Sequence, residues 1–230
     1  MRAFNHPYGV GYILGQVEVS EDEMALLSDL YDAELGALDA ELGTLLDGLD
    51  AAGILDDTVV VITSDHGEHL GEHGLMDHKF SLHRTLTRVP LLVRYPDRFD
   101  CGRVVEQPVR LEDVMPTVLE LAGVAVPDGL DGESLTGGLD GRLVYGAWGV
   151  WARAVPEAKE WFPDAEFSLF HTSLRSVYDG RYHYIRDSRG NQELYDLARD
   201  PDELHNLAEA EPETVRRMRA LLAEGERGSD

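Results

Sequence analysis

Acidic and imidazole side chains gather in one stretch of this 230-residue sequence, directly after an apolar run. Residues 58–63 are β-branched and apolar without alternation, which is typical of a strand buried on both faces in a parallel sheet. Asp65 and His66 follow at its carboxyl end, and His78 and Lys79 lie further along. Open α/β sheets bind ligands in the crevice beyond the carboxyl ends of their strands. These four side chains are therefore the candidates for chemistry.

Asp65 and His66 are candidate metal ligands. Because they are adjacent, both can reach one ion only where the chain turns sharply, and Gly67 supplies that freedom. A carboxylate oxygen and an imidazole nitrogen together suit a divalent cation that acts as a Lewis acid on an anionic ester. The alternative is that Asp65 caps the following turn and His66 is merely exposed.

The other polar residues of the stretch have competing interpretations. His69 and His73 would share a helix face with His66, but two glycines interrupt that helix, so we expect both to face solvent. The order of residues is not the H-E-x-x-H of a zinc protease. Lys79 and His78 could hold an anionic group beside a metal and stabilise a charged leaving oxygen. An ordinary exposed lysine is the alternative.

The composition excludes several kinds of partner. The 44 acidic and 20 basic residues give a net charge of −24, which argues against nucleic acid or an anionic membrane. A surface rich in acids, with only Lys79 and Lys159 as lysines, indicates a salt-loving host. The single cysteine, Cys101, excludes an internal disulfide and a cysteine-based metal cluster. Neither a signal peptide nor a membrane-spanning segment is recognisable, so a cytoplasmic protein is expected.

The first part of the chain predicts an α/β arrangement around the residue 58–63 strand. Ser20 and Glu23 form a capping box, and leucines spaced by three and four predict a helix that runs to about Ala52 and packs by its leucine stripe. Residues 88–95 predict a second strand, 104–109 a third, and 111–122 a helix. We expect residues 1–140 to form a mostly parallel sheet flanked by helices.

The last part of the chain predicts a smaller, antiparallel arrangement. Asp179-Gly180 is a strong hairpin signal between residues 173–178 and 181–186. Residues 143–148 and 193–196 add two further strands, and 211–223 a closing amphipathic helix. Residues 141–230 are thus expected to form a small antiparallel sheet with a helix on it.

With these motifs, the sequence resembles the sulfatases of the alkaline-phosphatase superfamily over most of residues 20–222. Residues 55–68 and 70–74 are similar to the family's second metal-binding segment. Lys79, followed nine residues later by Arg88-Val89-Pro90-Leu91, is similar to its lysine segment. Residues 113–123 with 131–135 resemble the family's helix and loop, and residues 193–207 its carboxy-terminal signature.

The resemblance implies an alkaline-phosphatase-like α/β fold and a hydrolase of small-molecule sulfate esters. In the family, a formylglycine or a serine attacks sulfur while a divalent metal and basic residues neutralise the sulfuryl oxygens. The resemblance assigns Asp65 and His66 as metal ligands, for Ca²⁺ or, as the second choice, Mn²⁺. It assigns Lys79, with His78, as the contact to the sulfate or its leaving group. The Asp-His version also occurs in relatives that cleave phosphate or phosphonate esters, which is the alternative activity.

The sequence also departs from the family pattern. The Cys/Ser-x-Pro/Ala-x-Arg segment that carries the nucleophile and the paired aspartates of the first strand are not found. A Tyr-acid pair usual before Arg-Val-Pro is replaced by His83-Arg84. The chain thus resembles the carboxy-terminal half of a sulfatase, with half of the metal site and no formylglycine nucleophile of its own. A missing amino-terminal half would then be its partner, and a non-catalytic relic or anion-binding module is the alternative.

Overall fold

The computed structural model describes residues 6–228 and divides the chain into two compact units. Among the described residues, the sheet unit comprises residues 6–24, 66–88 and 143–228, and the helix unit comprises residues 25–65 and 89–142. The sheet unit resumes at Leu143, close to the expected boundary, but it also contains two earlier segments, so the division at residue 140 stays a prediction.

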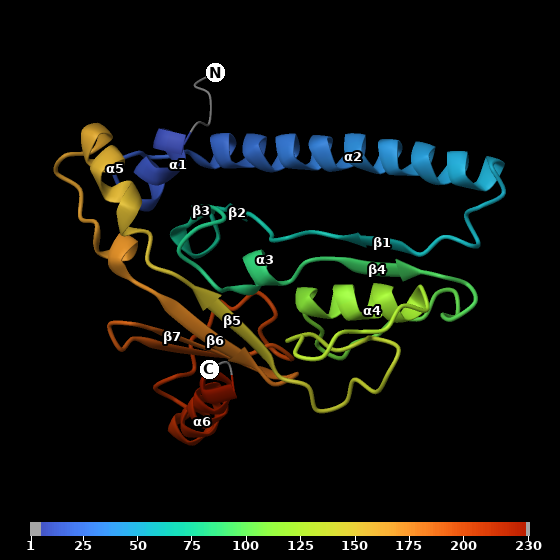
Figure 1. Cartoon of the computed structure of the whole chain (residues 1–230). Coiled ribbons are helices and arrows are strands. Elements are labelled where there is room, and N and C mark those ends of the chain that lie inside the picture. The colour runs from blue at the N-terminus through green and yellow to red at the C-terminus, as the bar shows by residue number, and fades with distance from the viewer. Residues whose placement is uncertain (1–5, 229–230) are drawn as a thin grey trace. The chain divides into compact units, whose positions relative to one another are not determined.

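A four-stranded antiparallel sheet organises the sheet unit (Figure 1). Its strands are β5 (Val144–Trp148), β6 (Leu174–Tyr178), β7 (Tyr182–Asp187) and β8 (Gln192–Asp196), in that spatial order. The hairpin between β6 and β7 turns at Gly180, whose φ of 94° favours glycine. The Asp179 carboxylate accepts the N–H groups of Arg181 and Tyr182 at 2.9 and 2.7 Å. The predicted hairpin is therefore confirmed.

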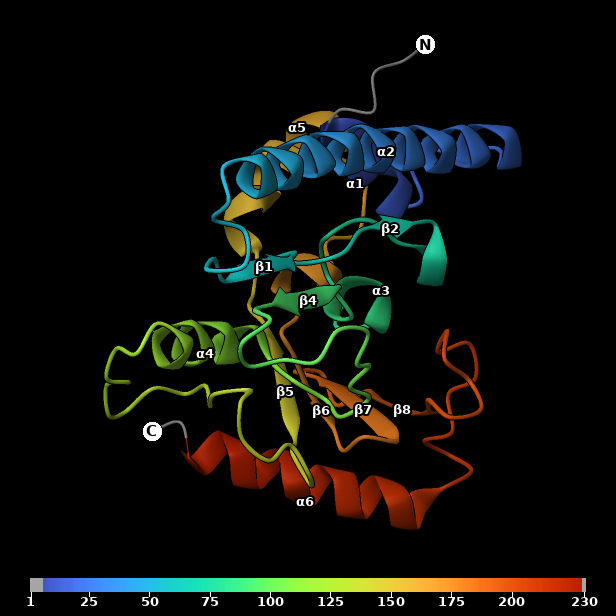
Figure 2. The same cartoon turned by 90° about the vertical axis from the view of Figure 1, so that its right-hand side faces the viewer.

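Helix α6 (Pro212–Gly228) lies along one face of this sheet (Figure 2). Tyr184 and Leu194 of the sheet and Met218 of the helix are completely buried in the cluster between them. Leu82 and Ile185 belong to a separate buried cluster. The alternating pattern of the strands thus supplies apolar side chains to more than one cluster, as a covered sheet requires.

Short elements complete the sheet unit. They are α1 (His6–Ile13), β2 (His69–Leu70), η1 (Glu72–Gly74), β3 (Met76–Asp77), α3 (Arg84–Thr87), η3 (Ala152–Ala154), α5 (Val155–Trp161) and η4 (Ser168–His171). A third apolar cluster forms where Val10 of α1 meets Phe80, Ala158, Phe167 and Phe170. The segment 66–88, which contains the candidate residues, is therefore held between apolar clusters of the same unit.

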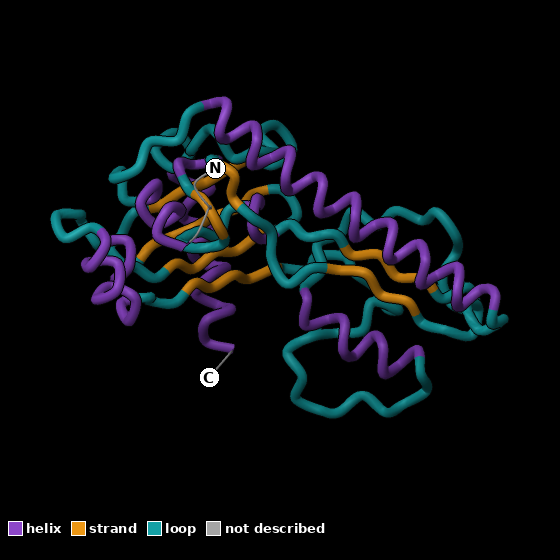
Figure 3. The backbone as a smooth tube through the Cα atoms, turned by 90° about the horizontal axis from the view of Figure 1, so that it is seen from above, coloured by secondary structure: helices purple, strands orange, loops and turns teal. Residues whose placement is uncertain are grey.

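The helix unit contains a two-stranded ribbon and helices with little apolar burial. Strand β1 (Val60–Thr63) pairs antiparallel with β4 (Leu91–Arg94), and Figure 3 shows the two side by side. The parallel pairing expected for residues 58–63 is therefore wrong within residues 6–228, where every strand pair is antiparallel. Residues 104–109 form no strand. The remaining elements are η2 (Leu111–Asp113) and α4 (Val114–Leu121).

A buried carboxylate holds the loops of the helix unit. The Asp113 side chain is fully buried and accepts hydrogen bonds from the Arg142 guanidinium at 2.7 Å and from the N–H groups of Glu133 and Arg110 at 2.9 and 2.7 Å. Burial alone would raise the pKa of this carboxyl, but these donors outweigh it and the pKa lies below its usual value. The loop that follows α4 is thus held by polar contacts.

Helix α2 (Glu21–Ala51) is a continuous helix with an exposed apolar stripe. Its capping box is confirmed, because Ser20 N–H donates to the Glu23 carboxylate at 3.0 Å and Glu23 N–H to Ser20 Oγ at 3.3 Å. The expected packing of its leucine stripe is wrong: none of its residues is buried, and Leu38 and Leu45 are 54% and 58% exposed. Within residues 6–228, none of the helices combines the length and apolar character that a bilayer crossing requires.

Met218→Ala should lower the free energy of unfolding of the sheet unit by about 2–5 kcal/mol, because it opens a cavity between α6 and the sheet. Urea unfolding followed by tryptophan fluorescence measures this unit, since all three tryptophans, Trp148, Trp151 and Trp161, lie in it. Met115→Ala on α4, where the side chain is 56% exposed, is the matched control and should change stability by about 0.5 kcal/mol at most. Equal losses in both variants would contradict the assigned core.

Candidate functional site

A short antiparallel ribbon brings two of the polar residues together. Strands β2 and β3 pair with His69 opposite Asp77, and continuing this register by one residue places Glu68 opposite His78. The Nδ1 atom of His78 lies 2.9 Å from Glu68 Oε1 and 2.6 Å from Asp77 Oδ1. The ribbon therefore holds one imidazole between two carboxylates.

His66 lies beside His78, and a tight backbone contact of the next residue, Gly67, positions it there. Gly67 N–H donates to the Leu86 carbonyl at 2.9 Å, and a Cβ atom on Gly67 would lie only 2.0 Å from the Thr85 carbonyl oxygen. Only glycine fits there. His66 Nδ1 lies 2.9 Å from the Gly67 carbonyl, and its ring stacks on that of His78 with the centroids 4.2 Å apart.

His66, Glu68 and His78 are the one group in residues 6–228 whose arrangement could hold a metal ion. One ligand atom from each lies within 4.8 Å of the others, and their side chains are 40%, 31% and 41% exposed. Two imidazoles and a carboxylate are good ligands for divalent cations of the first transition series. The three side chains are partly exposed, so a bound ion could also contact a substrate.

Lys79 is the buried neighbour of this group. Its side chain is only 10% exposed, its ammonium pairs with the Asp77 carboxylate, and it lies 5.4 Å from the centre of the Trp151 ring. Burial would raise the pKa of Asp77, but the Lys79 ammonium and the His78 N–H lower it further than burial raises it. Asp77 adopts a left-handed φ of 71°, a conformation that non-glycine residues adopt mainly where surrounding contacts enforce it.

The structure thus brings together three of the four predicted residues in one unit. His66 stacks on His78, and Lys79 follows His78 in the chain and pairs with Asp77. Asp65 is exposed and follows β1 in the helix unit, so its assignment as a ligand stays a prediction. Sequence reasoning missed the contribution of Glu68 and Asp77, because strands of two residues leave no periodic signal.

A second group of histidines lies deeper in the sheet unit. His69, expected to face solvent, is instead fully buried, and no hydrogen-bond partner for its ring is found among the described residues. His73 and His83 stack in parallel with their centroids 3.7 Å apart, and each lies within 6.4 Å of the His69 ring. Burial, with the charge of His83 second, lowers the pKa of His69 to about 4. Burial also lowers the pKa of His73.

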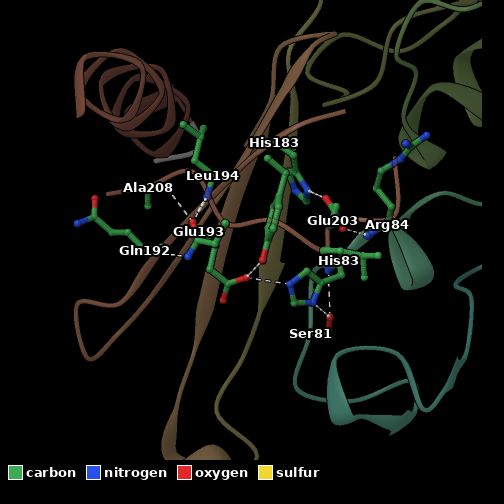
Figure 4. Close-up of polar contacts among 12 residues, drawn as sticks. Ser81, His83, Arg84, His183, Gln192, Glu193, Leu194, Glu203 and Ala208 are labelled. Atoms are coloured by element: carbon green, nitrogen blue, oxygen red, sulfur yellow. Dashed lines mark hydrogen bonds and ion pairs between the residues drawn. The ribbon is translucent and has the colours of Figure 1, made fainter. Parts of the chain in front are cut away.

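His83 links this group to the sheet (Figure 4). Ser81 Oγ accepts the His83 N–H at 3.0 Å and lies 2.9 Å from Nδ1, while Nε2 lies 2.8 Å from Glu193 Oε2. The Tyr195 hydroxyl donates to the same oxygen at 2.6 Å. A carboxylate accepts hydrogen bonds but does not donate them, so His83 carries its proton on Nε2. The Nδ1 atom of His83 then accepts a hydrogen bond from the Ser81 hydroxyl. These hydrogen bonds attach His83 to strand β8.

A second carboxylate fixes the next residue. Glu203 is almost completely buried; its Oε1 lies 2.5 Å from His183 Nδ1, and its Oε2 accepts the Arg84 N–H at 2.7 Å (Figure 4). Burial would raise the pKa of Glu203, but the bond to His183 and the charge of that ring outweigh it and lower the pKa. His83-Arg84, which departs from the family pattern, is thus held by two glutamates of the carboxy-terminal segment, the partly exposed Glu193 and the buried Glu203.

The pH dependence of stability should report the buried state of His69. The pKa of His69 is about 4 in the folded state, against the usual 6.5. Between these two pH values the His69 ring is protonated in the unfolded chain and neutral in the folded chain. The stabilisation is complete above pH 6.5 and should fall by about 3 kcal/mol as the pH drops to 4. His69→Leu should flatten this fall, since the buried ring has no hydrogen-bond partner to lose.

Unfolding by urea at pH 7, 6, 5 and 4.5 would test this. Glu193 and Glu203 do not interfere, because their pKa values are lowered from the usual 4.5 and their contribution to stability is lost only as the pH falls below that value. His205→Asn, at a side chain that is 79% exposed, is the control and should keep the slope of the parent chain. An unchanged slope in His69→Leu would show that other groups bind the protons.

Comparison with known proteins gives the family. The family profile described as N-sulphoglucosamine sulphohydrolase, C-terminal, matches residues 71–226, and the profile described as Sulfatase matches residues 12–124. Arylsulfatase K of Xenopus laevis is 32% identical over 207 residues, which are 86% of this chain and 37% of that protein. The chain therefore spans about a third of the length of the curated relatives it matches.

Solved structures agree with the sequence relatives. A 2-O GAG sulfatase superposes with a TM-score of 0.79 at 25% identity, over 96% of this chain and 49% of that protein. The phosphonate monoester hydrolase of Agrobacterium radiobacter superposes with a TM-score of 0.74 at 29% identity, over 91% of this chain and 43% of that protein. The predicted α/β class, with a small antiparallel sheet and a closing helix, is thereby confirmed. The chain belongs to the sulfatase family and has its alkaline-phosphatase-like fold.

Proposed function

We propose that this chain forms the carboxy-terminal part of a metal-dependent hydrolase of sulfate esters. The observation that carries the proposal is the His66, His78 and Lys79 group. All three residues lie in the region matched by the Sulfatase profile, and His78 and Lys79 also lie in the region matched by the second profile. The relatives extend well beyond the matched region, and the nucleophile motif of the family is not found in this sequence. The attacking group would therefore come from an amino-terminal segment.

Asp65 and His66 would hold the divalent cation. The contact of His66 Nδ1 with the Gly67 carbonyl supports this role, because a carbonyl only accepts, so the ring proton lies on Nδ1 and the Nε2 lone pair is directed elsewhere. Asp65, which directly precedes His66 in the chain, would add a charged oxygen that suits Ca²⁺ or Mn²⁺. A cation bound there would neutralise the sulfuryl oxygens of the ester.

Lys79 and His78 would act on the anionic groups of the ester. The ammonium of Lys79 is nearly buried, where its interaction with a negative oxygen is stronger than in water. Asp77 takes one of its three N–H donors and orients the group, which leaves the others for a sulfate oxygen. His78 is held by Glu68 and Asp77 and can give a proton to the leaving oxygen.

A second activity within the same superfamily has one specific support. The phosphonate monoester hydrolase of Agrobacterium radiobacter is among the structural neighbours, at 29% identity. Comparing kcat/KM for 4-nitrophenyl sulfate and for an aryl phosphonate monoester decides between the two. A strong preference for the phosphonate ester would replace sulfate as the substrate.

Lys79→Met should lower kcat/KM for 4-nitrophenyl sulfate by about 10²–10³, because it removes a charge aimed at the reacting group. The assay uses a protein in which this chain is joined to, or mixed with, an amino-terminal sulfatase segment that carries the nucleophile motif. Lys159→Met is the matched control, since Lys159 is the only other lysine and lies over Phe167. Loss of activity in both variants would remove Lys79 from the site.

The same assay tests the relic alternative. Turnover that appears on adding the amino-terminal segment eliminates a non-catalytic relic or anion-binding module. Robust metal-dependent turnover by the chain alone would refute the argument that the nucleophile lies elsewhere.

Asp65→Ala should weaken Ca²⁺ binding by the completed protein by about tenfold or more, since it removes a charged ligand. Isothermal titration calorimetry measures the affinity. Asp57→Ala, an exposed acidic residue before β1, is the control and should bind Ca²⁺ as the parent does. Unchanged affinity in Asp65→Ala would exclude Asp65 as a ligand.

A further inference from the structure

We propose that a hollow between helix α6 and the sheet binds a small organic anion, a sulfate or phosphate ester on a hydroxylated body such as a sugar. The hollow has a volume of about 520 Å³ and lies wholly within the sheet unit. Sites for small molecules usually measure about 300–1,000 Å³. Three guanidinium groups line this hollow, from Arg175 of β6, Arg186 of β7 and Arg219 of α6.

The register of the sheet places two of these arginines side by side. Arg175 pairs with Arg186, and Arg186 pairs with Gln192 of β8, so the three side chains form a row across one face. Tyr184 lies on the same face, two residues before Arg186, and is completely buried in the cluster beneath α6. Like charges directly opposite each other in an antiparallel pair are destabilising. An anion bound between the two guanidinium groups would relieve their repulsion.

Positive charge is in excess around the hollow. Among the described residues, neither Arg175 nor Arg219 forms an ion pair, and Arg175 donates only to a main-chain carbonyl at 3.0 Å. Arg186 binds Glu226 through Nη2 alone, at 2.9 Å to each oxygen. The Asp187 carboxylate is occupied by its own turn, where it accepts two backbone N–H groups and a side-chain amide at 2.9, 2.8 and 2.6 Å. In a chain whose net charge of −24 repels anions, this local excess favours an oxyanion.

Neutral hydrogen-bonding groups complete the lining. The Tyr184 hydroxyl donates to Gln192 Oε1 at 2.7 Å, so the amide nitrogen of Gln192 is directed away from that bond and keeps its two N–H donors. Ser188 Oγ accepts one backbone N–H at 3.1 Å and can donate its own proton. Burial raises the pKa of Tyr184, and the charges of Arg186 and Arg219 oppose that rise, so both act on its hydroxyl. These neutral groups suit the hydroxyls of a sugar, while the guanidinium groups suit its ester oxygens.

The hollow lies on the face of the sheet opposite to the one that segment 66–88 contacts. Leu82 of that segment packs on Ile185, and successive side chains of a strand point to opposite faces, so Ile185 and Tyr184 face apart. Lys79 does not line the hollow. The proposed binding therefore does not depend on the proposed hydrolysis.

Isothermal titration calorimetry of the 230-residue chain with glucose 6-sulfate and glucose 6-phosphate tests the site, with glucose as the neutral probe. We expect one ester molecule per chain and no saturable binding of glucose. The ester that binds more tightly identifies the group that is recognised. Arg175→Gln and Arg219→Gln should each weaken binding by about tenfold or more, because each removes a charged donor. Arg216→Gln is the matched control, since Arg216 is on the same helix, pairs with Glu213 and does not line the hollow.

Three results would overturn the proposal. The first is the absence of saturable binding of either ester. The second is parental affinity in both Arg175→Gln and Arg219→Gln, or an equal loss in Arg216→Gln, with circular dichroism showing that each variant is folded. The third is loss of binding in Lys79→Met, which would place the ester at the proposed reaction site. Turnover of sulfate esters enters none of these readouts, so failure of this site and failure of the proposed hydrolase are separate outcomes.

Discussion

The close approach of the Gly67 backbone to helix α3 is the contact on which the candidate site depends. A Cβ atom at Gly67 would collide with the Thr85 carbonyl oxygen, so this position admits no side chain. The N–H of Gly67 bonds to the Leu86 carbonyl there, and the neighbouring His66 ring is fixed by the Gly67 carbonyl. The direction of the His66 ring is thus set by main-chain geometry.

The other groups of the candidate site come after Gly67 in the chain, and each is positioned by its own contacts. The β2–β3 ribbon places Glu68 opposite His78, and the left-handed Asp77 turns the chain so that His78 and Lys79 can both reach its carboxylate. Further along, His83 and Arg84 are fixed by Glu193 and Glu203 of the carboxy-terminal segment. Residues separated by more than a hundred positions in the sequence therefore hold one histidine-rich segment in place.

The sequence predicted well those elements whose signals are local. The capping box at Ser20 and the Asp179-Gly180 hairpin depend on residues within a few positions of each other, and both formed as predicted. The burial of His69 and the pairing of Glu68 with His78 depend on packing and on the register of a very short ribbon. Neither leaves a periodic pattern, so the sequence alone could not have given them.

The lack of information about packing partners also explains why two predictions about the helix unit are wrong. An apolar, β-branched run such as residues 58–63 indicates a strand but does not determine its partner, and here the partner is antiparallel β4. Likewise a leucine stripe indicates an amphipathic helix but not which surface covers it. Family resemblance supplied the fold class because it uses the order of several motifs rather than any one pattern.

The uncovered leucine stripe of α2 has a consequence for the behaviour of the chain in solution. Leu35, Leu38 and Leu45 are each about half exposed, so they offer neighbouring molecules an apolar strip to associate with. Against this acts the repulsion between chains that each carry a net charge of −24. Salt shortens the range of that repulsion to about 10 Å at 0.1 M, while it leaves the apolar attraction in place. Higher ionic strength should therefore favour association of chains through this strip.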